Sequence, residues 1–169
     1  MRIENSMPSD VPRIFELYRI ATSYMKSKNQ VAWPEFEREL ITKEIKEQRQ
    51  WKLIIEDKIA CIWATTLNDE LIWGIQDHDP SIYIHRIATS PDFRGRKLVS
   101  NIILWANEFG KKHNLQYIRM DTVGVNEGLI KHYTGLGFDF LGTKYLPEKS
   151  ELPAHYHNGK VCYFQKEIK

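Results

Sequence analysis

The turn formed by Arg94, Gly95, Arg96 and Lys97 has the residue types of an anion-binding site. It lies between a strand candidate and a helix candidate. The first turn of a helix has unpaired backbone N–H groups and a partial positive charge. A glycine permits close approach of the backbone, and three cations could neutralise a pyrophosphate. An ordinary exposed helix start is also compatible with these residues, so the turn alone does not decide between the two.

A second pattern follows about thirty residues later in the chain. Asn126 and Tyr133 are seven residues apart, or two helical turns, so they lie on the same side of one helix with Leu129 and Ile130 between them. Taken singly, the asparagine could be a helix cap and the tyrosine a core residue. The full pattern NxxLIxxYxxxGF, ending at Phe138, is more specific.

With the strand end RIATSP, these motifs resemble the GNAT superfamily of acyl-CoA-dependent N-acyltransferases. The resemblance covers most of the chain in element order, and its motifs span residues 82–138. Lys97 and Val99 depart from the family pattern, which usually has glycine at the first position and glycine or alanine at the second.

The resemblance implies that acetyl-CoA is the acyl donor. Backbone groups of Ile87, Ala88 and Thr89 would pair with pantetheine, and the implied pyrophosphate site is Arg94, Gly95, Arg96, Lys97, Leu98 and Val99. Asn126 and Tyr133 complete the implied cofactor site. The expected reaction moves an acetyl or short acyl group from the CoA thioester directly to a primary amine, on a small molecule or a peptide. The alternative is a catalytically silent domain that binds acyl-CoA as a sensor or through a partner.

In such a reaction the amine must lose a proton and the departing thiolate must gain one. The resemblance assigns the second task to Tyr133. His85 is a candidate base because it titrates near neutral pH and would share a strand face with Tyr83 and Ile87. A structural histidine bonded to a neighbour is the more common role for such a residue. Asp121 could act through water, orient His85, or cap the following turn.

Aromatic residues are candidates for the acceptor pocket, because a protonated amine binds well to an aromatic face. Trp33, Tyr83 and His85 are the expected acceptor contacts, and Trp33 is favoured because it lies between the first two helix candidates. Trp63 and Trp73 could contribute, although tryptophans most often belong to the core.

Composition limits the other possibilities. The chain has 169 residues and a formal net charge of +2, which suits one domain over residues 1–169 and argues against nucleic acid as a partner. No apolar run suggests a membrane segment, so we expect a cytoplasmic protein, with a homodimer possible. Cys61 and Cys162 are expected to be buried free thiols. The sets Asp77-His78-Asp79 and His155-Tyr156-His157 lack an identifiable third ligand, so no metal is expected.

Hydrophobic periodicity gives the elements that must position these residues. It predicts helices over residues 11–25, 34–45, 98–109 and 126–136. Strands are expected over residues 2–6, 51–56, 58–67, 81–89, 116–122, 138–145 and 160–168, with residues 68–80 as a loop or hairpin extension. The mixture indicates an α/β (α+β mixed) fold around one sheet. The resemblance further implies a central mixed, splayed β-sheet of about six to seven strands flanked by about four helices.

Overall fold

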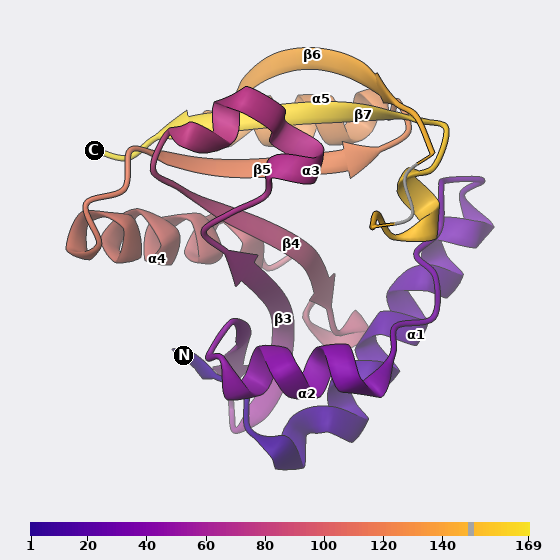
Figure 1. Cartoon of the computed structure of the whole chain (residues 1–169). Coiled ribbons are helices and arrows are strands. Elements are labelled where there is room, and N and C mark those ends of the chain that lie inside the picture. The colour runs from indigo at the N-terminus through magenta and orange to yellow at the C-terminus, as the bar shows by residue number, and fades with distance from the viewer. Residues whose placement is uncertain (149–150) are drawn as a thin grey trace.

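The computed structural model describes residues 1–148 and 151–169. These residues form one mixed sheet of seven strands in the order β1-β2-β3-β4-β5-β7-β6 (Figure 1). The strands are β1 (Arg2–Asn5), β2 (Gln50–Ile55), β3 (Lys58–Thr66), β4 (Ser81–Thr89), β5 (Tyr117–Val123), β6 (Asp139–Leu146) and β7 (Gly159–Glu167). The predicted fold class is therefore confirmed.

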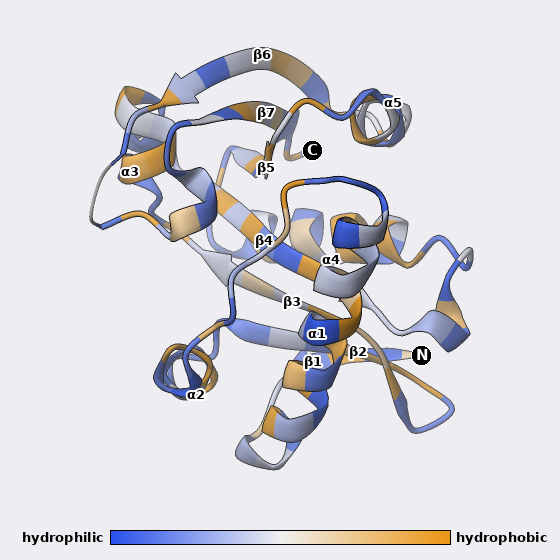
Figure 2. Cartoon of the chain, turned by 90° about the vertical axis from the view of Figure 1, so that its right-hand side faces the viewer, coloured by the Kyte–Doolittle hydropathy of each residue, from blue (hydrophilic) through white to orange (hydrophobic). Residues whose placement is uncertain are grey.

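Five α-helices occur in the described part of the chain. They are α1 (Val11–Ser27), α2 (Arg38–Lys46), the one-turn α3 (Glu70–Trp73), α4 (Leu98–Lys112) and α5 (Glu127–Gly135). Both hydrophobic and hydrophilic residues occur along α1 and α2, as expected for helices that cover a sheet with one face (Figure 2). None of these described helices is long and apolar enough to cross a membrane.

The helices cover the two faces of the sheet. The largest core cluster joins α4 and α5 to one face, where Ile102 and Tyr133 meet strand residues such as Ile84. On the other face, α1 and α2 pack through Ile14 and Ile41. Cys61 and Cys162 are buried and free, as predicted.

The strands β4 and β5 separate at the centre of the sheet. They are parallel, and their pairing is limited to Ser81–Tyr83 against Tyr117–Arg119. Beyond that point β4 pairs only with β3, and β5 pairs only with β7. The two strands diverge visibly toward their carboxyl ends (Figure 1). Their facing backbone groups are therefore available for another extended chain.

A bulge in β4 alters which side chains face which helices. The register with β3 shifts by one residue between the pairs Ala64–His85 and Ile62–Ala88, and Arg86 takes a left-handed φ of 55°. Ala88 consequently packs with the α1 and α2 cluster, whereas Ile87 packs against the α4 side. The prediction that Ile87 shares a face with His85 is wrong, because the extra residue reverses the alternation.

The segment from 68 to 80 was predicted as a loop or hairpin extension, but residues 70–78 of it are helical. α3 is followed by a 3-10 turn over Gly74–His78. The buried Arg119 of β5 fixes this segment, because its guanidinium donates to Asp79 Oδ2 at 2.7 Å and to the Gln76 carbonyl. The second predicted helix also begins later than expected, at Arg38. Hydrogen bonds from Arg119 on a distant strand, rather than the local sequence pattern, determine the form of the 68–80 segment.

Candidate active site

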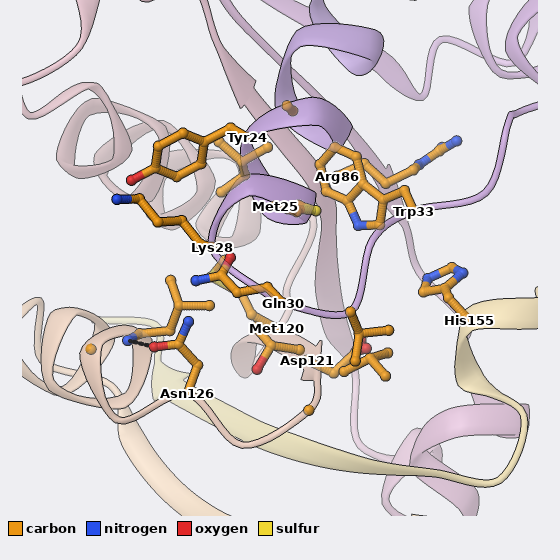
Figure 3. A pocket seen from close by; sticks show the side chains of 18 of the residues that line it. Tyr24, Met25, Lys28, Gln30, Trp33, Arg86, Met120, Asp121, Asn126 and His155 are labelled. Atoms are coloured by element: carbon orange, nitrogen blue, oxygen red, sulfur yellow. Dashed lines mark hydrogen bonds between the residues drawn. The ribbon is translucent and has the colours of Figure 1, made fainter.

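A cleft of about 850 Å³ occupies the space where β4 and β5 diverge. Its walls come from β4, β5, the start of α5, the end of α1 and the connection that follows α1. The predicted residues that line it are Trp33, His85, Ile87, Ala88, Thr89, Arg94, Asp121, Asn126 and Tyr133. In Figure 3, Tyr24, Lys28 and Asn126 lie at one end of the cleft, and Trp33 and His155 lie at the other.

A second hollow, of about 590 Å³, adjoins the basic turn. It is lined by the turn and the start of α4 on one side and by α5 on the other. Thr89 and Arg94 line both this hollow and the main cleft. The six predicted turn residues 94–99 therefore come together here. Lys131 and His132 of α5 also line the hollow and were not predicted, although they lie inside the NxxLIxxYxxxGF pattern.

The backbone of the basic turn has the shape expected of a glycine-rich turn. Gly95 has a φ of 79°, and Lys97, at the N-cap of α4, has a φ of 55°. Lys97 therefore adopts the left-handed conformation that glycine takes without penalty. The main chain at Lys97 keeps the conformation of a glycine, while the lysine side chain adds a cation.

Tyr133 is placed by packing against aromatic residues. Its ring centroid lies 5.1 Å from that of Phe164 and 6.1 Å from that of Phe138. Among the described residues its hydroxyl has no hydrogen-bond partner, although its side chain reaches the cleft. Burial raises the pKa of Tyr133 to about 12, so the phenol keeps its proton at neutral pH. Asn126 caps α5, since its Oδ1 accepts the Leu129 N–H at 3.1 Å.

His85 lies between two carboxylates from different elements. Its Nε2 is 3.1 Å from Oδ2 of Asp69, the residue before α3, and its Nδ1 is 3.8 Å from Oδ1 of Asp121 on β5. The Tyr156 hydroxyl, from the connection between β6 and β7, donates to the other oxygen of Asp121 at 2.7 Å. The predicted pair of His85 and Asp121 is thus brought together, and Asp69 and Tyr156 are additions to it.

Burial and charge shift the proton equilibria of this cluster. Burial raises the pKa of Asp121 to about 6, against the attraction of His85. For His85, burial lowers the pKa, but the nearby Asp69 and Asp121 outweigh it, so the net pKa is raised above its ordinary value. His155, near Arg86 and His85, has a pKa lowered to about 4, first by burial and then by those cations. These pKa shifts leave Asp121 mostly ionised and His155 neutral at neutral pH, and they favour the imidazolium form of His85 more than in a free histidine.

Asp69, His85 and Asp121 can also be compared with the ligand set of a metal site. One atom each from Asp69, His85 and Asp121 lies within 4.8 Å of the others, which is close enough to consider a divalent ion. However, the two ring nitrogens face different carboxylates, as in a cluster that shares protons. The acids of the Asp77-His78-Asp79 set have other contacts, since Asp77 accepts the Asp69 backbone N–H at 2.7 Å and Asp79 pairs with Arg119.

Only some of the predicted acceptor residues line the cleft. Trp33 lines the cleft and packs edge-on to Tyr18, with ring centroids 5.8 Å apart. Tyr83 does not line the cleft: it is only 1% exposed, and its hydroxyl accepts from Arg119 Nη1 at 3.1 Å. Trp63 and Trp73 are core residues. His155 and Tyr156 take part in the cleft wall instead.

Comparison with known proteins agrees with this geometry. Residues 14–138 match the model of the Acetyltransferase (GNAT) family. An uncharacterized N-acetyltransferase of Bacillus subtilis, YesJ, is 34% identical over 74 residues, which are 44% of this chain and 41% of that protein. The chain therefore matches about two fifths of the length of this curated relative.

Solved structures show the same fold. An acetyltransferase of the GNAT family from Listeria monocytogenes has a TM-score of 0.78 at 23% identity, covering 99% of this chain and 94% of that one. The ribosomal-protein-S18-alanine N-acetyltransferase of Escherichia coli has a TM-score of 0.68 at 14% identity, with coverage of 99% and 94%. The chain belongs to the GNAT acetyltransferase family, whose members catalyse acyl transfer.

Proposed function

We propose that the protein transfers an acetyl or short acyl group from acyl-CoA to the primary amine of a small molecule or peptide. The observation that carries this proposal is the cleft between β4 and β5, which joins the basic turn at one end to the His85 and Asp121 pair at the other. A donor that lay along this cleft would bring its thioester close to both Tyr133 and His85.

The donor would be held by backbone and by charge. Pantetheine amides would pair with the backbone of Ile87, Ala88 and Thr89, where β4 has no strand on its β5 side. The pyrophosphate would lie against the amides at the start of α4, with Arg94 and Lys97 supplying charge. The hollow beside α5 provides room for this part of the cofactor.

The chemistry then needs two proton transfers. The neutral amine attacks the thioester carbonyl carbon, the C–S bond breaks, and an N–H proton passes to His85, directly or through water. The CoA sulfur takes the Tyr133 phenolic proton as the C–S bond breaks and leaves as the thiol, and solvent later reprotonates the tyrosinate. The net products are the N-acyl amine and CoA thiol. Asp121 would stabilise the imidazolium form of His85.

A catalytically silent acyl-CoA sensor remains the second candidate. It is favoured by Lys97 and Val99, which replace small residues of the family pattern in the phosphate turn. Both candidate functions require the turn, which would bind the cofactor. Only the enzyme also requires a base and an acid in the cleft. The presence of His85, Asp121 and Tyr133 around one cleft favours the enzyme.

Release of CoA thiol distinguishes the candidates. The protein would be mixed with acetyl-CoA and a panel of polyamines, amino acids, aminoglycosides and peptides. We expect amine-dependent thiol release and a matching mass increase in one class of amine. A chelator should leave the rate unchanged, as no metal takes part in the steps above. Binding of acetyl-CoA without thiol release for any amine would favour the sensor.

A further inference from the structure

Two buried carboxylate oxygens face the His85 ring without another donor. Within the described residues, Asp69 Oδ2 and Asp121 Oδ1 are both shielded from solvent, and neither accepts a well-formed hydrogen bond, from His85 or from any other group. Buried carboxylate oxygens ordinarily require a donor or a cation. The His85 ring lies beside both oxygens, with Nε2 3.1 Å from Asp69 Oδ2 and Nδ1 3.8 Å from Asp121 Oδ1.

We propose that Asp69 is the positioning residue for the base, and that it holds the His85 proton on Nε2 so that Nδ1 takes the proton of the acceptor amine. This proposal rests on the proposed function. The unequal distances support it: when the imidazolium loses one proton, the nitrogen at 3.1 Å from a carboxylate keeps its proton in preference to the one at 3.8 Å. Nδ1 then has the free lone pair.

The placement of the two carboxylates agrees with these different roles for Nε2 and Nδ1. Asp121 lines the cleft together with His85, whereas Asp69 is not among the lining residues. In this proposal the Nδ1 edge, on the side of Asp121, is the one that the acceptor amine approaches. Asp69 acts from behind, through His85, and has no contact with the proposed substrate.

Asp69 is itself rigidly held. Its backbone N–H donates to Asp77 Oδ1 at 2.7 Å, and its carbonyl accepts from Trp73 N at 2.8 Å. The Tyr163 hydroxyl of β7 donates to the Ile72 carbonyl at 2.9 Å, which ties α3 to the sheet. A residue fixed on this support can keep a ring in one orientation, as a catalytic base requires.

The groups that face His85 determine how its protonation would respond to pH. Asp69 from the start of α3 and Asp121 from β5 favour the imidazolium, while Arg86 on β4 disfavours it. His155 lies close enough for its own pKa to be lowered by His85, and Tyr156 hydrogen-bonds to Asp121. Removal of the Asp69 charge should therefore make His85 easier to deprotonate, and should also release the constraint on the tautomer.

Nitrogen-15 NMR of the imidazole tests the proposal without reference to turnover. In the wild type, we expect neutral His85 to carry its proton on Nε2. In Asp69→Asn we expect a mixture of tautomers, with Glu70→Gln as the matched control, because Glu70 is an exposed neighbour with the same charge. A neutral wild-type His85 protonated on Nδ1 would overturn the proposal. Because that result comes from the wild type, it stands even if Asp69→Asn fails to fold.

Kinetics give a second readout. Asp69→Asn should lower kcat by about a hundredfold with little change in KM, and move the acidic limb of the pH profile to lower pH, whereas Glu70→Gln should change neither. An unchanged limb and kcat would contradict the positioning role. If the wild type showed the Nε2 tautomer but acetylated no amine, the proposed function would fail while the assignment of Asp69 to His85 stood.

Discussion

At the scale of single residues, Tyr133 has a packed ring and a hydroxyl with no hydrogen-bond partner among the residues that the structure describes. The ring contacts Phe164 and Phe138, while the phenol, with its pKa raised to about 12, keeps its proton. In water a thiol is a stronger acid than this phenol. Tyr133 can therefore give its proton to the CoA sulfur only while the C–S bond breaks, and solvent must then reprotonate the tyrosinate.

Replacement of Tyr133 by phenylalanine tests that role. We predict that Tyr133→Phe lowers kcat by roughly a hundredfold, because only the proton donor is lost. The affinity for acetyl-CoA should change little, since the ring packing is preserved. Steady-state thiol release measures both. Tyr145→Phe is the matched control: Tyr145 is 60% exposed and does not line the cleft. Equal kcat for Tyr133→Phe and wild type would remove Tyr133 from the mechanism.

Asp121 illustrates a conflict between stability and function. Its folded pKa is raised to about 6 by burial, so the folded protein binds this proton more tightly than the unfolded chain does. Its ionisation therefore lowers stability as pH rises from about 4 to about 6, and the loss persists above that range.

We predict that Asp121→Asn stabilises the protein while it lowers activity. The gain in unfolding free energy should reach up to about 3 kcal/mol at pH 8, and should be smaller at pH 5, where much of the wild-type carboxyl is already protonated. Urea unfolding at the two pH values measures the gains. A gain that was larger at pH 5 than at pH 8 would show that Asp121 is not a destabilising buried charge.

At the scale of elements, the turn before α4 combines a glycine-like backbone with a charged side chain. Lys97 has a φ of 55° and is the N-cap of α4. Alanine and glycine at this position would both remove the charge, but only glycine takes the left-handed conformation freely.

We therefore predict that Lys97→Gly is more stable than Lys97→Ala by about 1 kcal/mol. Both variants should bind acetyl-CoA more weakly than wild type, since the proposed pyrophosphate site loses one cation. Thermal unfolding gives the first comparison and calorimetric titration the second. Tighter binding by both variants would mean that the lysine obstructs the site.

The element that carries a site residue determines whether that residue could be predicted from the sequence. Asn126, Tyr133 and the basic turn belong to local patterns, and the structure brings them to the two hollows. Asp69 and Tyr156 reach His85 and Asp121 from irregular segments, whose positions depend on contacts with distant strands. The side on which Ile87 lies depends on a bulge, which hydrophobic alternation does not record.

At the scale of the whole molecule, the divergence of β4 and β5 links fold to function. These two strands pair only over Ser81–Tyr83 and Tyr117–Arg119 before they separate, and the cleft follows from that separation. The remaining expectations, namely a cytoplasmic location, a single domain over residues 1–169 and a possible homodimer, stay predictions from the sequence.

The most direct test is the melting temperature of the protein with and without acetyl-CoA. A ligand at a hundred times its Kd stabilises the folded state by about 2.7 kcal/mol, which raises Tm by roughly 5–10 °C for a chain of this size. We predict such a rise for the wild type at millimolar acetyl-CoA and a smaller one for Arg94→Ala. An unchanged wild-type Tm at that concentration would contradict an acyl-CoA site in the cleft.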